Sequence, residues 1–191
     1  MNNLFDCGIS RHHLRTLEEI SKPDPVNGEE IKPVTNSHAY AIDFDNVTAE
    51  YAKDIKKAKV PTSVDALFQH SSGELYFIEF KSSKPESTQR REELKLNAVE
   101  GVLTLMELTN AERSCIRKSV TFLVVFNDDE SKEQQTAKAR RRDIMQKIGR
   151  QLTSKGLKLS RLKHVYFKDA GAMTSEEFDA YITEQNWTSM A

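Results

Sequence analysis

The sequence predicts an α/β fold in which a layered sheet is covered by interspersed helices. Two short apolar runs, residues 63–69 and 74–81, flank a turn that contains Gly73, and this pattern is typical of a β-hairpin. Residues 92–108 carry apolar side chains at helical spacing, and residues 119–126 form an unbroken apolar, β-branched run. A hairpin, an amphipathic helix and a strand buried on both faces, in that order, indicate a sheet packed between helices.

The elements before the hairpin have weaker signals. Residues 11–20 have a loose helical spacing, and the proline-rich residues 22–33 predict a loop. Residues 38–45 alternate between apolar and polar side chains, which indicates a strand. Residues 48–59 are rich in Lys and Ala and predict a short helix that ends before Pro61.

The elements after the hairpin alternate between helix and strand. The helix over residues 92–108 is expected to start after a cap at Ser87 or Thr88. Residues 132–154 predict a second amphipathic helix, and residues 163–168 a further short strand. A terminal helix over residues 175–185 is opened by Thr174, with Glu177 three residues on, which is the capping-box pattern.

The length of 191 residues predicts a single domain. Within it, residues 1–37 form an N-terminal helix and loop extension, residues 38–126 the core, and residues 127–191 a C-terminal helix–strand–helix unit.

Charge and composition limit the classes of partner. The formal net charge is -1, so any basic surface has to come from local clustering. The two cysteines, Cys7 and Cys115, are far apart and give neither a disulfide framework nor a CxxC metal pattern. The longest apolar runs, residues 102–106 and 120–126, are too short to span a bilayer. We therefore expect a cytoplasmic protein without a membrane partner.

The predicted hairpin gathers three charged side chains. Glu79 and Lys81 lie two residues apart on one strand and therefore share a face, while Phe80 points to the other face. A hairpin centred near Ser72 pairs Asp65 with Glu79. Two carboxylates suit a hard cation such as Mg²⁺ or Mn²⁺, which can polarise a phosphate and activate water. A neighbouring lysine can stabilise developing charge or act on the attacking water.

This spacing resembles the signature of the PD-(D/E)XK nuclease superfamily. Asp65, thirteen intervening residues and then Glu79-Phe80-Lys81 carry the resemblance, which continues more loosely through residues 92–126. The resemblance implies a restriction-endonuclease-like three-layer core, α-β-β-β-α-β, with a mixed central sheet and extra C-terminal elements. It implies Asp65 and Glu79 as metal ligands, Lys81 as the catalytic lysine, Mg²⁺ or Mn²⁺ as cofactor and nucleic acid as substrate, with DNA favoured over RNA. It also leaves a homodimer open.

The chain departs from the family pattern at two places. Val64, and not proline, precedes Asp65. Family members often add a carboxylate from the first core helix, and Glu50 is the favoured candidate for it. Glu18 or Glu19 is the alternative if residues 38–45 are the first core strand.

Other charged groups allow more than one interpretation. Arg90, Arg91 and Lys95 begin the helix after the hairpin and are candidate phosphate contacts. The basic cluster at residues 138–142 is interpreted as a solvated helix face. No metal role is expected for His12-His13, because adjacent side chains usually face apart.

The hairpin therefore predicts a metal-dependent nuclease. The alternative is a catalytically inactive protein of the same fold that acts as a nucleic-acid-binding or protein-interaction subunit.

Overall fold

The structure is a computed structural model that describes residues 9, 11–23, 25, 32–56, 59–127 and 157–187. The helix predicted over residues 132–154, including the basic cluster at residues 138–142, lies outside the described residues.

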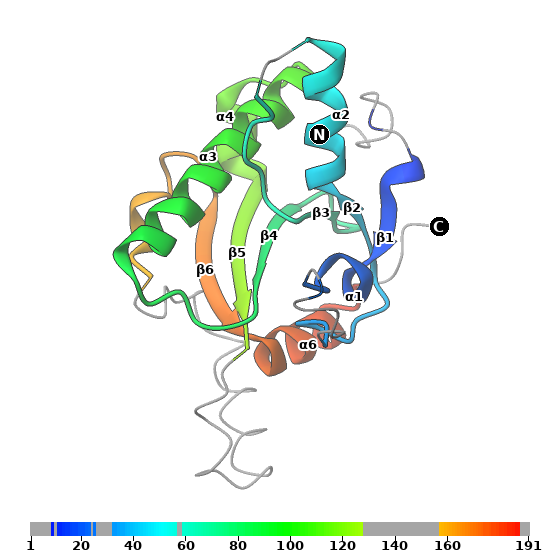
Figure 1. Ribbon diagram of the computed structural model, residues 1–191, viewed down its shortest axis with the longest axis vertical. Helices are drawn as coiled ribbons and strands as arrows, with labels where there is room; N and C mark the ends of the chain where they lie inside the picture. Colours follow the sequence, from blue (N-terminus) through cyan, green and yellow to red (C-terminus); the bar gives the residue numbers. More distant parts are fainter. Residues whose placement is uncertain are drawn as a thin grey trace, which may run out of the picture.

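A mixed six-stranded sheet forms the centre of the described chain (Figure 1). The strands lie in the sheet in sequence order, so each strand pairs with the next one along the chain. The pairings from the first to the fourth strand are antiparallel, and the last two are parallel. The strands are β1 (Leu14–Thr16), β2 (Tyr40–Asp43), β3 (Ala66–Gln69), β4 (Leu75–Lys81), β5 (Val120–Phe126) and β6 (Asp169–Thr174).

Helices cover both faces of this sheet, which confirms the predicted α/β class. One face carries α2 (Phe44–Asp54), α3 (Thr88–Thr109), α4 (Arg113–Ser119) and the 3₁₀ turn η4 (Leu159–Arg161); the other carries α1 (Leu17–Ile20) and α6 (Ser175–Glu184). A further 3₁₀ turn, η2 (Arg11–His13), precedes β1. In the described part of the chain, none of these helices has the length and apolarity that a bilayer-crossing helix needs.

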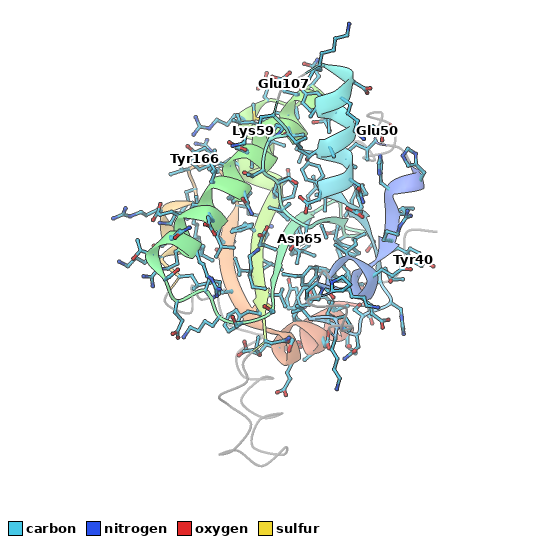
Figure 2. All side chains as sticks on the ribbon, viewed as in Figure 1. Tyr40, Glu50, Lys59, Asp65, Glu107 and Tyr166 are labelled. Atoms are coloured by element: carbon cyan, nitrogen blue, oxygen red, sulfur yellow. The ribbon has the colours of Figure 1, made fainter. Side chains whose placement is uncertain are left out.

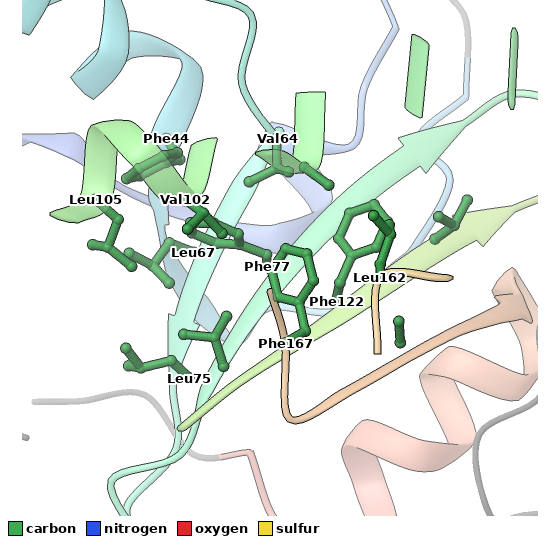
Figure 3. Close-up of a cluster of buried hydrophobic side chains, with 14 of the residues drawn as sticks. Phe44, Val64, Leu67, Leu75, Phe77, Val102, Leu105, Phe122, Leu162 and Phe167 are labelled. Carbon is green, nitrogen blue, oxygen red and sulfur yellow. The ribbon is translucent and has the colours of Figure 1, made fainter. Parts of the chain in front are cut away.

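The face under α2 and α3 is packed around aromatic side chains of the central strands (Figure 3). Phe77 of β4 has no exposed surface and contacts Phe44 of α2 and Phe167, with ring centroids 5.1 and 6.2 Å apart. Val102 and Leu105 of α3 are also buried, as its helical spacing predicted. This packing holds α2 and α3 against the strands that carry the candidate site.

The opposite face is closed by Trp187. Its ring stacks on Phe68 of β3, with centroids 4.0 Å apart, and contacts Tyr76 of β4 and Phe178 of α6. These contacts anchor the end of the described chain on the sheet, so Trp187 serves as a packing residue.

The hairpin has the predicted register. Ala66 pairs with Ile78 and Leu67 with Phe77, so the strands are symmetric about position 72. Gly73, with φ 85°, provides the left-handed residue that the turn requires. Asp65 therefore lies directly before β3, where the continued register brings it towards Glu79.

The predicted helix caps are confirmed. The Ser87 side chain accepts a hydrogen bond from the Arg90 backbone amide at the start of α3. Thr174 and Glu177 form the reciprocal capping box of α6.

The helix predicted over residues 11–20 is wrong. This segment divides into η2, strand β1 and the four-residue helix α1, which is capped by Thr16. The reason is tertiary, because β1 completes its hydrogen bonds by pairing with β2, and a local pattern does not show such pairing.

The boundary between β2 and α2 also differs from the prediction. The strand ends at Asp43, whose side chain accepts a hydrogen bond from the Asn46 amide and caps α2. Phe44 and Asp45 therefore belong to the helix and not to the strand predicted over residues 38–45. An aspartate can cap a helix as readily as it can face solvent on a strand, so alternation alone gave the wrong boundary.

The last strand is displaced from its predicted position. Residues 163–168 form one isolated bridge, Lys163 to Phe167, and His164 has a φ of 63° that interrupts an extended chain. Strand β6 follows immediately, although its sequence DAGAMT is poor in β-branched residues. Its pairing with the buried strand β5 determines this conformation.

Candidate metal centre

Glu79 and Lys81 occupy the end of β4 and share the face that packs under α2 and α3. Lys81 Nζ lies 2.6 Å from Glu79 Oε1. The Glu79 side chain is 1% exposed, whereas the Lys81 side chain is 38% exposed. The pair therefore extends from the protein interior to the surface.

Asp65, directly before the neighbouring strand β3, joins this pair. Its Oδ2 accepts a hydrogen bond of 2.5 Å from the Phe80 backbone amide, which lies between Glu79 and Lys81. Its backbone carbonyl accepts a hydrogen bond from the Phe44 amide at 3.0 Å. Asp65 thus connects β4 with the first turn of α2.

The Asp65–Phe44 bond brings Asp45 to the same site, and sequence reasoning missed this residue. Asp45 lies next to Phe44 in the first turn of α2, and Ser63 Oγ donates a hydrogen bond to its Oδ1. The charge of Asp45 acts on Asp65, Glu79 and Lys81. A signal was present in the sequence, because an acidic residue just after a strand can begin the next helix.

Asn97 of α3 is the second residue that sequence reasoning missed. Its Nδ2 donates a hydrogen bond of 3.0 Å to Glu79 Oε1. Asn97 is only partly exposed and precedes Ala98, which is fully buried on the helix face that meets the sheet. The amide therefore orients the Glu79 carboxyl without adding charge.

Burial changes the acidity of this group. Loss of hydration raises the pKa of Asp65 well above its usual value, and the Glu79 charge adds to the effect. Burial also raises the pKa of Glu79, although Lys81 opposes this shift. Burial likewise raises the pKa of Asp45, against the hydrogen bond from Ser63. For Lys81 burial acts in the lowering direction, but Glu79 and Asp65 outweigh it and raise the pKa, which favours the ammonium ion.

One oxygen at this site lacks a partner. Glu79 Oε2 is buried and accepts no hydrogen bond from the described residues. Leaving a buried carboxylate oxygen unsatisfied is costly, so such an atom calls for a specific explanation. Ionised Asp45, Asp65 and Glu79 would also outnumber the single positive charge of Lys81. A divalent cation would compensate both deficits, and the oxygen donors suit Mg²⁺ or Mn²⁺. The residues therefore fit the metal that the sequence predicts.

The residues of this group differ in their exposure to solvent. Glu79 is buried, Asp65 and Lys81 are partly exposed, and Asp45 is the most exposed residue of the four, although its carboxyl group is partly shielded from water beside Ser63.

Glu50 lies elsewhere on α2, on the side that faces the N-terminal segment, whereas Asp65 lies over the sheet (Figure 2). Glu50 Oε2 contacts the Nε2 atoms of His13 at 2.7 Å and His12 at 3.3 Å. The hydrogen bond with His13 lowers the pKa of Glu50. The expectation that adjacent histidines face apart is therefore wrong here.

The other carboxylate candidates are also engaged elsewhere. Glu18 Oε2 lies 3.2 Å from His38 Nδ1, and Glu19 completes the capping box with Thr16. The third carboxylate whose charge acts on Asp65 and Glu79 is Asp45.

The three predicted phosphate contacts lie in the first two turns of α3. Arg90 is exposed, Arg91 is partly exposed, and Lys95 Nζ pairs with Glu92 Oε1 at 2.5 Å. They precede Asn97 on the helix that reaches Glu79.

Comparisons with protein-family models, with curated proteins and with solved structures find no match to this chain, so the fold and the side-chain geometry described above are what bear on its function.

Proposed function

We propose that this protein is a divalent-metal-dependent nuclease of the PD-(D/E)XK type that hydrolyses phosphodiester bonds, with DNA favoured over RNA as substrate. The observation that carries the proposal is the buried, unpartnered Glu79 Oε2 beside Asp65 and Lys81. If the three acids and the lysine had only a structural role, the buried Glu79 Oε2 would stay without a hydrogen-bond partner, at a cost in free energy.

The topology supports a restriction-endonuclease-like core. Strands β2, β3 and β4 form an antiparallel meander, α3 follows, and β5 returns parallel to β4. This strand pairing is compatible with the β-β-β-α-β part of the core that the resemblance implies. The arrangement departs from it at α2, which is inserted between β2 and β3 and carries Asp45.

Each side chain has a role in the proposed reaction. Asp65, Glu79 and Asp45 would hold Mg²⁺ or Mn²⁺, and the bound ion would polarise the phosphate and activate water. Asn97 holds the Glu79 carboxyl in place by its hydrogen bond.

Lys81 is the group suited to the transition state. It is partly exposed and is favoured as an ammonium ion. It can therefore donate to a phosphate oxygen as negative charge grows there and orient the attacking water. Arg90 and Arg91 would hold the substrate backbone nearby.

The test is a cleavage assay of the full chain on linear, circular and single-stranded DNA and on RNA, with Mg²⁺ or Mn²⁺. Glu79→Gln keeps the shape of the side chain and removes its charge. Glu74→Gln is the matched control, because Glu74 lies at the opposite end of β4. We expect metal-dependent cleavage by the wild type and by Glu74→Gln, and none by Glu79→Gln.

Two results would contradict the proposal. One is that the folded wild-type protein cuts no substrate with either metal, in which case the non-catalytic alternative is preferred. The other is that Glu79→Gln cuts as fast as the wild type, which would attribute the activity to another site or to a contaminant.

A further inference from the structure

A second set of ligating side chains lies outside the proposed nuclease site. In the described part of the chain, His12, His13 and Glu50 form a group whose ligand atoms all lie within 4.8 Å of one another. Both imidazole Nε2 atoms point at the same carboxylate oxygen, Glu50 Oε2, at 3.3 and 2.7 Å. The two rings lie against each other, with centroids 3.9 Å apart.

The fold fixes this convergence. Strand β1 begins at Leu14, which pairs with Ile42 of β2, and α2 begins two residues after Ile42. The turn η2 therefore ends beside α2, with His12 and His13 on one side and Glu50 on the other. The three residues are therefore brought together by the sheet register and by the position of α2, and not by side-chain conformation alone.

The distances suit a shared ion. With metal–ligand bonds of about 2.0–2.1 Å, ligand atoms of a tetrahedral zinc site lie roughly 3.3 Å apart. The distance from Glu50 Oε2 to His12 Nε2, 3.3 Å, matches this spacing, and the distance to His13 Nε2, 2.7 Å, is shorter and would have to lengthen when an ion binds.

The ligand types select a different ion from that of the acidic centre. Two imidazoles and one carboxylate favour Zn²⁺ or a similar transition ion, whereas Mg²⁺ prefers oxygen ligands alone. The His12 and Glu50 side chains are 61% and 51% exposed, and that of His13 is 10% exposed. An ion can thus enter from solvent, and water can complete its coordination.

We propose that His12, His13 and Glu50 form a second divalent-metal site, selective for a transition ion such as Zn²⁺, that fastens the N-terminal segment to α2. The site is separate from the proposed nuclease centre in residues and in ligand chemistry, and it holds whether or not the protein cuts nucleic acid.

An ordinary histidine–glutamate pair in the same molecule provides the control. His38 Nδ1 lies 3.2 Å from Glu18 Oε2, and the His38 side chain is 83% exposed. This pair offers one imidazole and one carboxylate. If His12, His13 and Glu50 were only a surface ion pair, the two groups would respond alike to metal.

The experiment is calorimetric titration of the full chain, free of any polyhistidine tag, with Zn²⁺. It compares the wild type with His13→Gln, Glu50→Gln and the control His38→Gln. All four are also made with Glu79→Gln, so that zinc bound at the acidic centre does not obscure the result. A Co²⁺ absorption spectrum reports the ligand set independently of affinity.

In the Glu79→Gln series, the expected result is one high-affinity Zn²⁺ per chain in the protein with no further change and in the variant with His38→Gln. His13→Gln and Glu50→Gln should each weaken it by at least about tenfold, because changes to outer-shell partners alone cost roughly 10–100-fold. In the same series, zinc should raise the thermal midpoint of the protein with no further change and of the variant with His38→Gln only.

Either of two outcomes would overturn the proposal. In one, the folded wild-type chain takes up no Zn²⁺. In the other, His13→Gln and Glu50→Gln bind Zn²⁺ as tightly as His38→Gln, with an unchanged Co²⁺ spectrum.

Discussion

A glutamate–lysine pair lies at each end of β4, and the two pairs differ in their electrostatics. Glu74, just before the strand, pairs with Lys168, and its side chain is 39% exposed. The hydrogen bond from Lys168 lowers the pKa of Glu74. Glu79 lies 2.6 Å from Lys81 at the other end and is 1% exposed, yet its pKa is raised by burial.

The difference indicates that loss of hydration outweighs the lysine partner in the direction of the pKa shift of Glu79, whereas the lysine partner sets the direction for Glu74. At the surface, the Glu74 carboxylate is stabilised by Lys168 and by hydration from solvent. In the interior one lysine does not repay the cost of removing Glu79 from water, especially with Asp65 and Asp45 beside it. The buried pair is therefore incomplete without further positive charge, which is the basis for the proposed metal centre.

The largest expected difference between the two pairs is catalytic. Lys81→Ala should lower the metal-dependent cleavage rate by about 10²–10³-fold, the usual loss when one donor to developing negative charge is removed. Lys168→Ala removes the lysine of the other pair and should change the rate less than about twofold, since surface pairs contribute little. Single-turnover cleavage at saturating Mg²⁺ measures both rates, and equal losses in the two variants would remove the distinction between the pairs.

A smaller effect is expected in the pH dependence of stability. Because the pKa of Asp65 is raised in the folded protein, the folded state binds more protons than the unfolded state between the two pKa values. The stability from this group is thus complete below the unfolded pKa, about 3.9, and is lost as the pH rises through the folded pKa. The slope cannot exceed about 1.4 kcal/mol per pH unit for one proton.

Asp65→Asn should remove this decline. Urea unfolding of the wild type and of Asp65→Asn, with a chelator present and from about pH 4 to about pH 8, measures the difference. Parallel profiles for the two proteins would show that Asp65 is not the group that titrates.

The smallest effect concerns the stability of the surface pair. Glu74→Gln should lower the free energy of unfolding by about 0.2–1 kcal/mol, and less at high salt. Glu79→Gln in the metal-free protein should not lower it, because one of three acids crowded around Lys81 is neutralised. Denaturant unfolding at neutral pH compares them, and a larger loss in Glu79→Gln than in Glu74→Gln would contradict this account of the buried pair.

The sequence predicted the centre of the fold well, because its signals are local. Alternation in β4, the turn at Gly73 and the apolar run of β5 each depend on neighbouring residues, so the register followed. With the register came the proximity of Asp65 to the end of β4.

The parts that the sequence did not predict depend on distant partners. Strands β1 and β6 take their conformation from pairing with β2 and β5. Asp45 reaches the site because the Phe44 amide binds the Asp65 carbonyl, and Asn97 because α3 packs across β4. Apart from the position of Asp45 just after a strand, no pattern in the sequence distinguishes it from Glu50 as a neighbour of Asp65.

The most direct test of the proposed metal centre is Mn²⁺ binding followed by electron paramagnetic resonance. It is carried out in a His13→Gln background, so that the second proposed site does not contribute. We expect one Mn²⁺ per chain, with affinity unchanged by Glu74→Gln and reduced at least about tenfold by Glu79→Gln. Equal affinity in the two variants, or no binding by the folded protein, would contradict the assignment of Glu79 as a metal ligand.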